Sequence, residues 1–315
     1  MADGSTRVVL AALAGNGAIA LAKFAAAGLS GSTAMFTEAI HSLVDTGDQL
    51  FLLVGQWRGS RPPDETHPLG HGMETYFWSF VVALMVFVLG GVLSIYEGVR
   101  HMLRPEPVVS PLISLGVLAV AAVFEGASFR VGYREYKRVV RGRPIRLWEF
   151  IRRSKDPSLF SVLLEDSAAL IGIVLAAAGV IAASFFQIDW ADGAASVAIG
   201  LLLAGVALVL ANETRSLIAG ESVAPIVMDR LKETLARIDC ITRLDEIATL
   251  HLGPRAILVA LTLTFRPNST TKLIDEAIVE ITKCLQATDG RVAYVYVRPS
   301  HKGGQRLAKP GKLPA

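Results

Sequence analysis

The stretch EAIHSLVDTGDQLFLLVGQW, residues 38–57, combines an apolar helix pattern with three polar groups that are expensive to bury. His41, Asp45 and Asp48 stand at positions i, i+4 and i+7, so an α-helix would place them on one face. Ionisable side chains within a membrane span cost several kcal/mol and usually have a function. The stretch therefore predicts a membrane-spanning helix with one polar, functional stripe.

The composition of the whole chain agrees with a membrane protein. Of its 315 residues 52% are hydrophobic and 19% charged, and the mean hydropathy is +0.47. The net charge of only +3 gives no support to a nucleic-acid partner, so the lipid bilayer is the expected environment. Cys240 and Cys284 form no CxxC pair. The N-terminal stretch shows no evident cleavage site and is interpreted as the lead-in to a retained first span.

Six apolar segments are each long enough to cross a bilayer core of roughly 30 Å, which takes about 20 residues. They lie near residues 8–29, 34–57, 76–99, 109–133, 159–186 and 191–218. The loop after the fourth segment, residues 130–157, is dense in Arg and Lys, which is typical of cytoplasmic loops. This predicts that both termini are cytoplasmic. The expected location is a bacterial inner membrane, with export as the direction.

The pattern changes at about residue 220. Helical spacing, two strand-like runs, a second amphipathic helix with a Ser/Thr cap and a third strand follow one another in the order αββαβ. We predict a transmembrane domain at 1–219, a small α+β, ferredoxin-like cytoplasmic domain at 220–301 and a disordered basic tail at 302–315. A small sheet with exposed edges is a plausible dimerisation module.

Two predicted spans together carry the ligand types of a divalent transition-metal site. The second span supplies His41, Asp45 and Asp48, and the fifth supplies Glu165 and Asp166. Because a cation must displace protons from such ligands, the site would exchange metal for protons. The plainer alternative is that a histidine in a helix interior is a satisfied core group. Other charges in the spans, such as Glu97 and Glu125, are interpreted as structural.

Several stretches together resemble the cation diffusion facilitators, a family of metal/proton antiporters. They are GNGAIALAKFAAAGLSGSTAMFTEAIHSLVDTGDQL (15–50), HPLGHGMETYFWS (67–79), VLLEDSAALIG (162–172) and WADGAASVAIG (190–200). The resemblance implies six helices plus a cytoplasmic ferredoxin-like domain, usually in a homodimer. It implies no cofactor besides the transported cation and its counter-ion, the proton.

The family's transport site takes two ligands four residues apart on each of spans two and five. On this sequence the positions are His41, Asp45, Val162 and Asp166. Valine cannot bind a metal, so the fourth ligand is Glu165, Asp48 or a water molecule. Zinc is the first expectation, because His41 is present and the rest of the chain resembles zinc carriers. A carboxylate-rich set would also suit manganese, iron or cobalt.

The loop RPPDETHPLGHG, residues 61–72, offers a second ligand set. Asp64, His67 and His71 could chelate an ion if the loop curls helically, and some family members bind a cytoplasmic metal at the matched positions. Alternatively, the loop only shapes the entry to the third span, with Pro68 and Gly70 setting the turn.

The C-terminal domain lacks the histidine-rich metal pair of many family members. His251 is the only histidine in the predicted strands, and both His251 and His301 are expected to be ordinary exposed residues. The dimer is therefore expected to form without metal.

We expect a secondary transporter for a divalent cation. An intramembrane hydrolase is a weaker alternative, because the sequence has neither an HExxH nor a GxSxG motif, and no enzyme activity is expected. A membrane protein that senses metal without transporting it is a third possibility.

Overall fold

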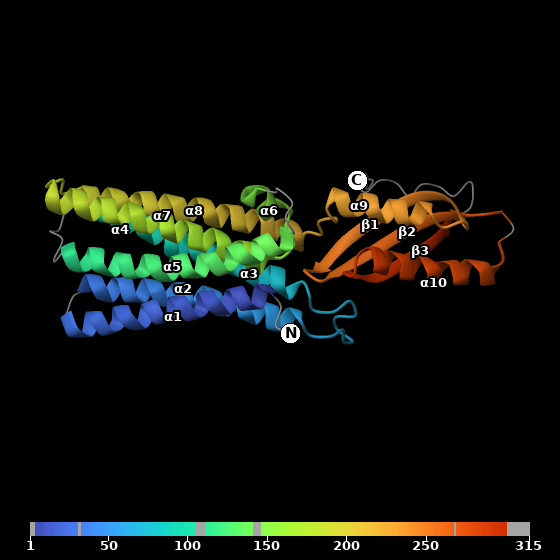
Figure 1. Cartoon of the computed structure of the whole chain (residues 1–315), viewed down its shortest axis with the longest axis horizontal. Helices are drawn as coiled ribbons and strands as arrows, with labels where there is room; N and C mark the ends of the chain where they lie inside the picture. Colours follow the sequence, from blue (N-terminus) through green and yellow to red (C-terminus); the bar gives the residue numbers. More distant parts are fainter. Residues whose placement is uncertain (1–3, 31–32, 105–110, 141–145, 268, 301–315) are drawn as a thin grey trace, which may run out of the picture. The chain divides into compact units, whose positions relative to one another are not determined.

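The computed structural model describes residues 4–30, 33–104, 111–140, 146–267 and 269–300. Within these ranges it leaves aside the side chains of residues 4–5, 23, 26–30, 33–41, 44 and 153. The chain forms two compact units, Met1–Ala219 and Gly220–Ala315. The predicted tail at 302–315 lies outside the described residues. Each unit has its own hydrophobic core and is described by itself (Figure 1).

The first unit consists of long helices that run alongside one another (Figure 1). The helices are α1 Gly4–Ser30, α2 Thr33–Gly59, α3 Glu74–Met85, α4 Leu93–Leu103, α5 Pro111–Val140, α6 Leu147–Arg153, α7 Pro157–Phe185 and α8 Ala191–Ile218, with the π-helical segment η1 Val86–Val92 joining α3 to α4. Each predicted span falls in α1, α2, the α3–η1–α4 run, α5, α7 or α8. The first unit is thus a multi-pass α-helical membrane domain.

Several of the helices are long and apolar enough to cross a membrane. Within the described residues, four runs are long and apolar enough to cross a membrane: Glu74–Leu103, Pro111–Val140, Pro157–Phe185 and Ala191–Ile218. In α1, whose last residues have no described side chains, the described part contains an apolar stretch at Thr6–Ala22. Helix α2 carries the polar stripe of His41, Asp45 and Asp48, and its first residues likewise have no described side chains.

The basic loop predicted at 130–157 is partly helical, which corrects the sequence expectation. Helix α5 continues to Val140, and the short helix α6 follows at Leu147–Arg153. Residues 141–145 between them lie outside the described residues. Arg and Lys are good helix formers, so a run of them can extend a helix beyond its apolar part.

Glycines let helix α8 approach the α3–η1–α4 run closely. A side-chain carbon at Gly98 would lie 2.7 Å from the carbonyl oxygen of Gly193, and one at Gly200 would lie 2.8 Å from that of Gly91. Both distances are too short for a real contact, so the two backbones meet only because these positions have no side chain. Such close packing by small residues is a typical way of joining helices in lipid.

The second unit has the predicted αββαβ order. Its elements are α9 Pro225–Ala236, β1 Ile241–Gly253, β2 Ala256–Phe265, α10 Thr271–Thr288 and β3 Val292–Ser300. The sheet order is β1-β2-β3, with β1 and β2 antiparallel and β2 and β3 parallel. The predicted cap is present, because the Thr270 side chain accepts a hydrogen bond from the Leu273 amide at 3.4 Å.

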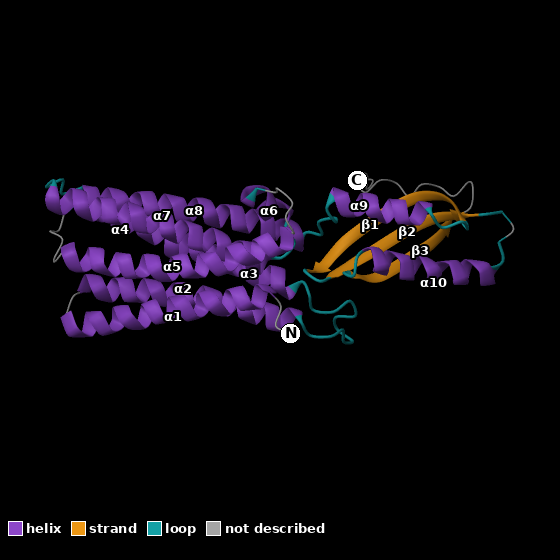
Figure 2. Ribbon diagram, in the orientation of Figure 1, coloured by secondary structure: helices purple, strands orange, loops and turns teal. Residues whose placement is uncertain are grey.

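One face of this sheet is covered by α9 and α10, as Figure 2 shows. The central strand alternates with period two, and its inward residues Ile257, Val259, Leu261 and Leu263 are buried. They pack against buried residues of the two helices, among them Leu231 and Ile281. The second unit is therefore an α+β domain with a core of its own.

His251 is buried, so the expectation of an exposed histidine was wrong. His251 is 1% exposed, and it lies opposite the core residue Ile257 in the sheet. The alternation of β1 explains the position, because Ile247, Thr249 and His251 share the face that meets the helices. His301 lies outside the described residues.

Candidate metal centres

The polar stripe of helix α2 contains buried groups. Asp48 and its neighbour Gln49 are 3% and 2% exposed, and Asp45 is partly buried. These three residues fall within one turn of helix, so they share a face. The side chain of His41 lies outside the described residues, although its backbone belongs to α2.

Helix α7 contributes Glu165 and Asp166, of which Asp166 is 2% exposed and Glu165 is partly buried. One turn earlier, Val162 is fully buried in the hydrophobic core of the first unit. The position that the resemblance assigns to a metal ligand is therefore a packing residue in this chain.

Gln49 of α2 and Glu165 of α7 are directly bonded. The Gln49 amide Nε2 donates to the Glu165 carboxylate Oε2 at 3.0 Å. Helix α7 itself packs mainly on α5 and α8, and α2 packs mainly on α1 and α3. The bond therefore ties together two helices that are not close packing partners.

Around this bond several buried oxygen atoms have no hydrogen-bond partner among the described residues. They are Oδ1 of Asp48, Oε1 of Gln49, Oε1 of Glu165 and Oδ2 of Asp166. A buried polar atom without a partner costs about 1–3 kcal/mol, and a charged one more. Carboxylate and amide oxygens are hard ligands. Either a divalent cation or a proton could therefore bind to these unpartnered oxygens.

The carboxylates also lie close enough to influence one another electrostatically. Asp45 acts on both Asp48 and Glu165, and Glu165 acts on Asp48. Helix α5 adds Glu125, whose charge acts on Glu165 and Asp166. The interpretation of Glu125 as a structural charge therefore left out its proximity to these carboxylates. Its signal in the sequence was its place within an apolar span, which is the signal that singled out the other carboxylates.

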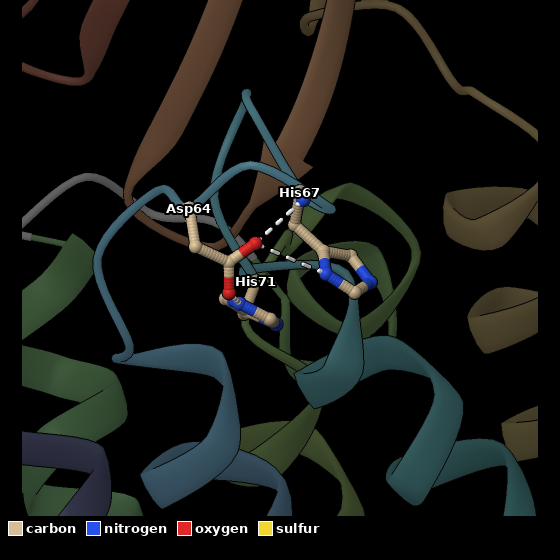
Figure 3. Close-up of side chains that lie close together, drawn as sticks. All are labelled: Asp64, His67 and His71. Carbon is tan, nitrogen blue, oxygen red and sulfur yellow. Dashed lines mark hydrogen bonds and ion pairs between the residues drawn. The ribbon is translucent and has the colours of Figure 1, made fainter.

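Among the described side chains, which leave out that of His41, three ligand atoms come close together in the loop. In the part of the chain that the structure describes, the set with three ligand atoms within 4.8 Å of one another is Asp64, His67 and His71. Figure 3 shows these three side chains together. The imidazole rings of His67 and His71 lie 4.1 Å apart between centroids.

Hydrogen bonds build the loop set around Asp64. One carboxylate oxygen, Oδ2, lies 2.8 Å from Nε2 of His71, and the other, Oδ1, accepts from the backbone amide of His67 at 2.7 Å. Thr66 also donates to Oδ1 through its hydroxyl at 2.8 Å. The bond with His71, followed by those from Thr66 and His67, holds the pKa of Asp64 well below its usual range.

The loop forms a turn and not a helical curl. The amide of Gly70 donates to the carbonyl of His67 at 2.9 Å, and Gly70 has φ +86°. Glycine adopts that conformation without steric cost. The turn leaves His71 with 11% of its side chain exposed, against 54% for His67 and 51% for Asp64. The loop thus both shapes the entry to α3 and offers a ligand set.

Comparison with known proteins identifies the family. The family model described as the cation efflux transmembrane domain matches residues 9–219, which is two thirds of the chain. The chain belongs to the cation efflux family. The helical membrane domain and the α+β domain agree with the fold that the resemblance to the cation diffusion facilitators implied.

Two relatives of this cation efflux protein are named for different metals. The chain is 33% identical over 250 residues to the mitochondrial proton-coupled zinc antiporter of Homo sapiens, and the match covers 79% of this chain and 44% of the human protein. The chain thus matches less than half the length of that relative. It is 23% identical over 252 residues to a manganese efflux system protein of Bacillus subtilis, covering 79% and 80%. A magnetosome protein of Magnetospirillum gryphiswaldense is 27% identical over 230 residues, covering 71% and 66%.

Proposed function

We propose that this protein is a secondary transporter that exports a divalent cation in exchange for protons, with zinc as the first candidate. The observation that carries the proposal is the set of buried oxygen atoms on α2 and α7 that have no partner among the described residues. A site that binds cation and proton in turn must offer both of them the same deprotonated atoms. Family membership and the name of the human relative, a proton-coupled zinc antiporter, support this proposal.

The proposed ligands are His41 and Asp45 on α2 and Asp166 on α7, with Glu165 as the fourth. Glu165 is preferred over Asp48 or a water molecule because its buried Oε1 lacks a partner among the described residues while its Oε2 is held by α2. Its charge lies within electrostatic range of Asp45, so a cation between them would relieve their repulsion.

Manganese, iron or cobalt is the second candidate class for the cargo. Val162 stands where a ligand is expected, and the buried unpartnered atoms of Asp48, Gln49, Glu165 and Asp166 are oxygens, which shifts the preference toward harder ions. The Bacillus relative named for manganese efflux agrees with this alternative.

We also propose a bacterial inner membrane as the location, both termini in the cytoplasm and a homodimer formed through the C-terminal domain. Helices cover one face of its sheet, and on the other face Tyr296 is 55% exposed.

Removing residues 220–315 should weaken dimerisation but leave metal binding by the first unit intact. Sedimentation of the full-length and shortened proteins, with and without metal, tests this.

Flux measurements on proteoliposomes test the transport proposal. An inward-directed proton gradient should drive zinc out of vesicles that contain the protein, and manganese, iron and cobalt measured in parallel would rank the cargo. Metal binding without flux would instead indicate a metal sensor. Flux that ignores the proton gradient would overturn the antiport mechanism while leaving metal transport in place.

A further inference from the structure

Gln49 is a buried polar residue that none of the metal-ligand positions includes. It lies one turn after Asp45 on α2, is 2% exposed, and reaches Glu165 of α7 at 3.0 Å. Its other end, the carbonyl Oε1, has no partner among the described residues. A buried amide that satisfies only one of its ends is unusual enough to require an explanation.

The chemistry of the amide accounts for this arrangement. An ionised carboxylate only accepts hydrogen bonds, so the NH₂ end of Gln49 must face Glu165. That bond occupies Oε2 of Glu165 and leaves its Oε1 without a partner among the described residues. The bond thus fixes the direction of the Glu165 carboxylate while one ligand oxygen stays available.

The neutrality of Gln49 matters as much as its donor. Asp45, Asp48 and Glu165 lie within electrostatic range of one another, so this region attracts a cation. A lysine or arginine at position 49 could also hold Glu165, but its charge would compete with the cargo. An amide holds the carboxylate without cancelling its charge.

Helix geometry gives Glu165 a need for such a tether. Glu165 and Asp166 are adjacent and therefore point about 100° apart around α7. Glu165 must reach toward α2 to join a site with Asp45, and the bond from Gln49 draws it in that direction. Val162, one turn before Asp166, offers no ligand of its own.

We propose that Gln49 is a positioning residue that orients Glu165 as a metal ligand and thereby sets the metal selectivity of the site. This inference rests on the proposed transport function. Without Gln49, the site keeps its histidine and two aspartates but loses the fixed direction of its extra carboxylate. Zinc is satisfied by four ligands, one of which can be water, whereas manganese prefers more oxygen ligands. The loss should therefore fall mainly on manganese.

The test compares zinc and manganese binding by the full-length protein. Gln49→Met keeps the length of the side chain and removes the donor. We expect its affinity for manganese to fall about tenfold, as is typical for a lost outer-shell partner, and its affinity for zinc to fall less than about threefold. The matched control is Gln56→Met, because Gln56 is also on α2 and accepts a hydrogen bond from Thr6 at 2.7 Å. The control should leave the ratio of the two affinities unchanged.

A double variant separates positioning from a general packing defect. With Glu165→Ala already in place, adding Gln49→Met should change either affinity by less than about twofold, because no carboxylate remains to be positioned. Equal losses for both metals in Gln49→Met, or full additivity with Glu165→Ala, would overturn the proposal. Should Gln49→Met fail to fold, Gln49→Leu provides the same comparison. A wild-type protein that binds metal but shows no flux would refute the transport function, and the affinity ratio would still decide the role of Gln49.

Discussion

The loop set and the intramembrane set use similar ligands in opposite ways. In the loop, both carboxylate oxygens of Asp64 have hydrogen-bond partners, and three ligand atoms already lie within 4.8 Å of one another. In the membrane domain, the carboxylates of Asp48, Glu165 and Asp166 each have a buried oxygen without a partner among the described residues. Among the described side chains, the loop ligands are held together by hydrogen bonds, whereas the intramembrane carboxylates keep oxygens without partners.

This difference suggests different tasks for the two sets. An exposed, internally bonded turn can take up an ion with little rearrangement, which suits binding. Buried oxygens that lack partners are stabilised when they bind either a cation or a proton. Because the cation and the proton compete for the same oxygens, binding of one is coupled to release of the other. We therefore propose that the intramembrane set serves transport and that the loop serves only binding.

The strongest test of this assignment removes an intramembrane carboxylate. Asp45→Ala or Asp166→Ala should lower zinc flux by at least about 100-fold, because even lost outer-shell partners of metal ligands cost roughly 10–100-fold. The stability of the protein should change little by comparison, since the substitution also removes a buried charge. Asp189→Ala, on an exposed turn, is the control. Wild-type flux in either variant would remove that residue from the site.

A second test adds a ligand where the family pattern expects one. Val162→His should raise the preference for zinc over manganese about tenfold, equivalent to about 1.4 kcal/mol. It should also reduce the dependence of zinc flux on Glu165. Val162 is fully buried, so the larger side chain should cost about 1–3 kcal/mol of stability. Val162→Leu controls for that cost without adding a ligand, and the same metal preference in both variants would refute the assignment.

The sequence predicted the fold because its signals are local and repeated. Apolar runs predicted the spans, and alternation together with a threonine cap predicted the αββαβ domain. The helical end of α5 and helix α6 were missed because Arg and Lys were interpreted as loop residues, although they favour helices. His251 was misplaced because a general expectation for histidines was used in place of the alternation of its own strand.

The site was less predictable, because it depends on contacts between helices. Charged residues within apolar spans were easy to recognise, and Asp48 and Asp166 are indeed buried. Gln49 was missed because a neutral amide does not stand out in a span. Its bond to Glu165 depends on the rotation and packing of α2 and α7, which a single sequence does not fix.

A third test, with a smaller effect on flux, concerns the loop. His71→Ala should remove one bound metal ion per chain, measured by equilibrium dialysis, because it leaves only two of three ligands. Zinc flux should fall by less than about threefold, since the intramembrane ligands are untouched. His101→Ala is the matched control, because His101 also faces a carboxylate, that of Asp192, at 3.8 Å. A loss of flux as deep as in Asp45→Ala would mean that the loop belongs to the transport path.

The smallest expected effect comes from Thr66, which helps to build the loop set without being a ligand in it. Thr66→Val removes the hydroxyl that donates to Oδ1 of Asp64 at 2.8 Å. Because that bond favours the charged carboxylate, its loss should raise the pKa of Asp64 toward the ordinary value near 4. Because the pKa of Asp64 is lower in the folded loop than in the unfolded chain, the charged carboxylate stabilises the folded loop at any pH above its ordinary pKa. That stabilisation is lost as the pH falls through the lowered pKa. Metal affinity of the loop at neutral pH should fall by no more than about threefold. Carboxylate NMR of the metal-free protein would follow Asp64 directly, and an unchanged titration would show that His71 and the backbone amides of residues 66 and 67 suffice to hold it.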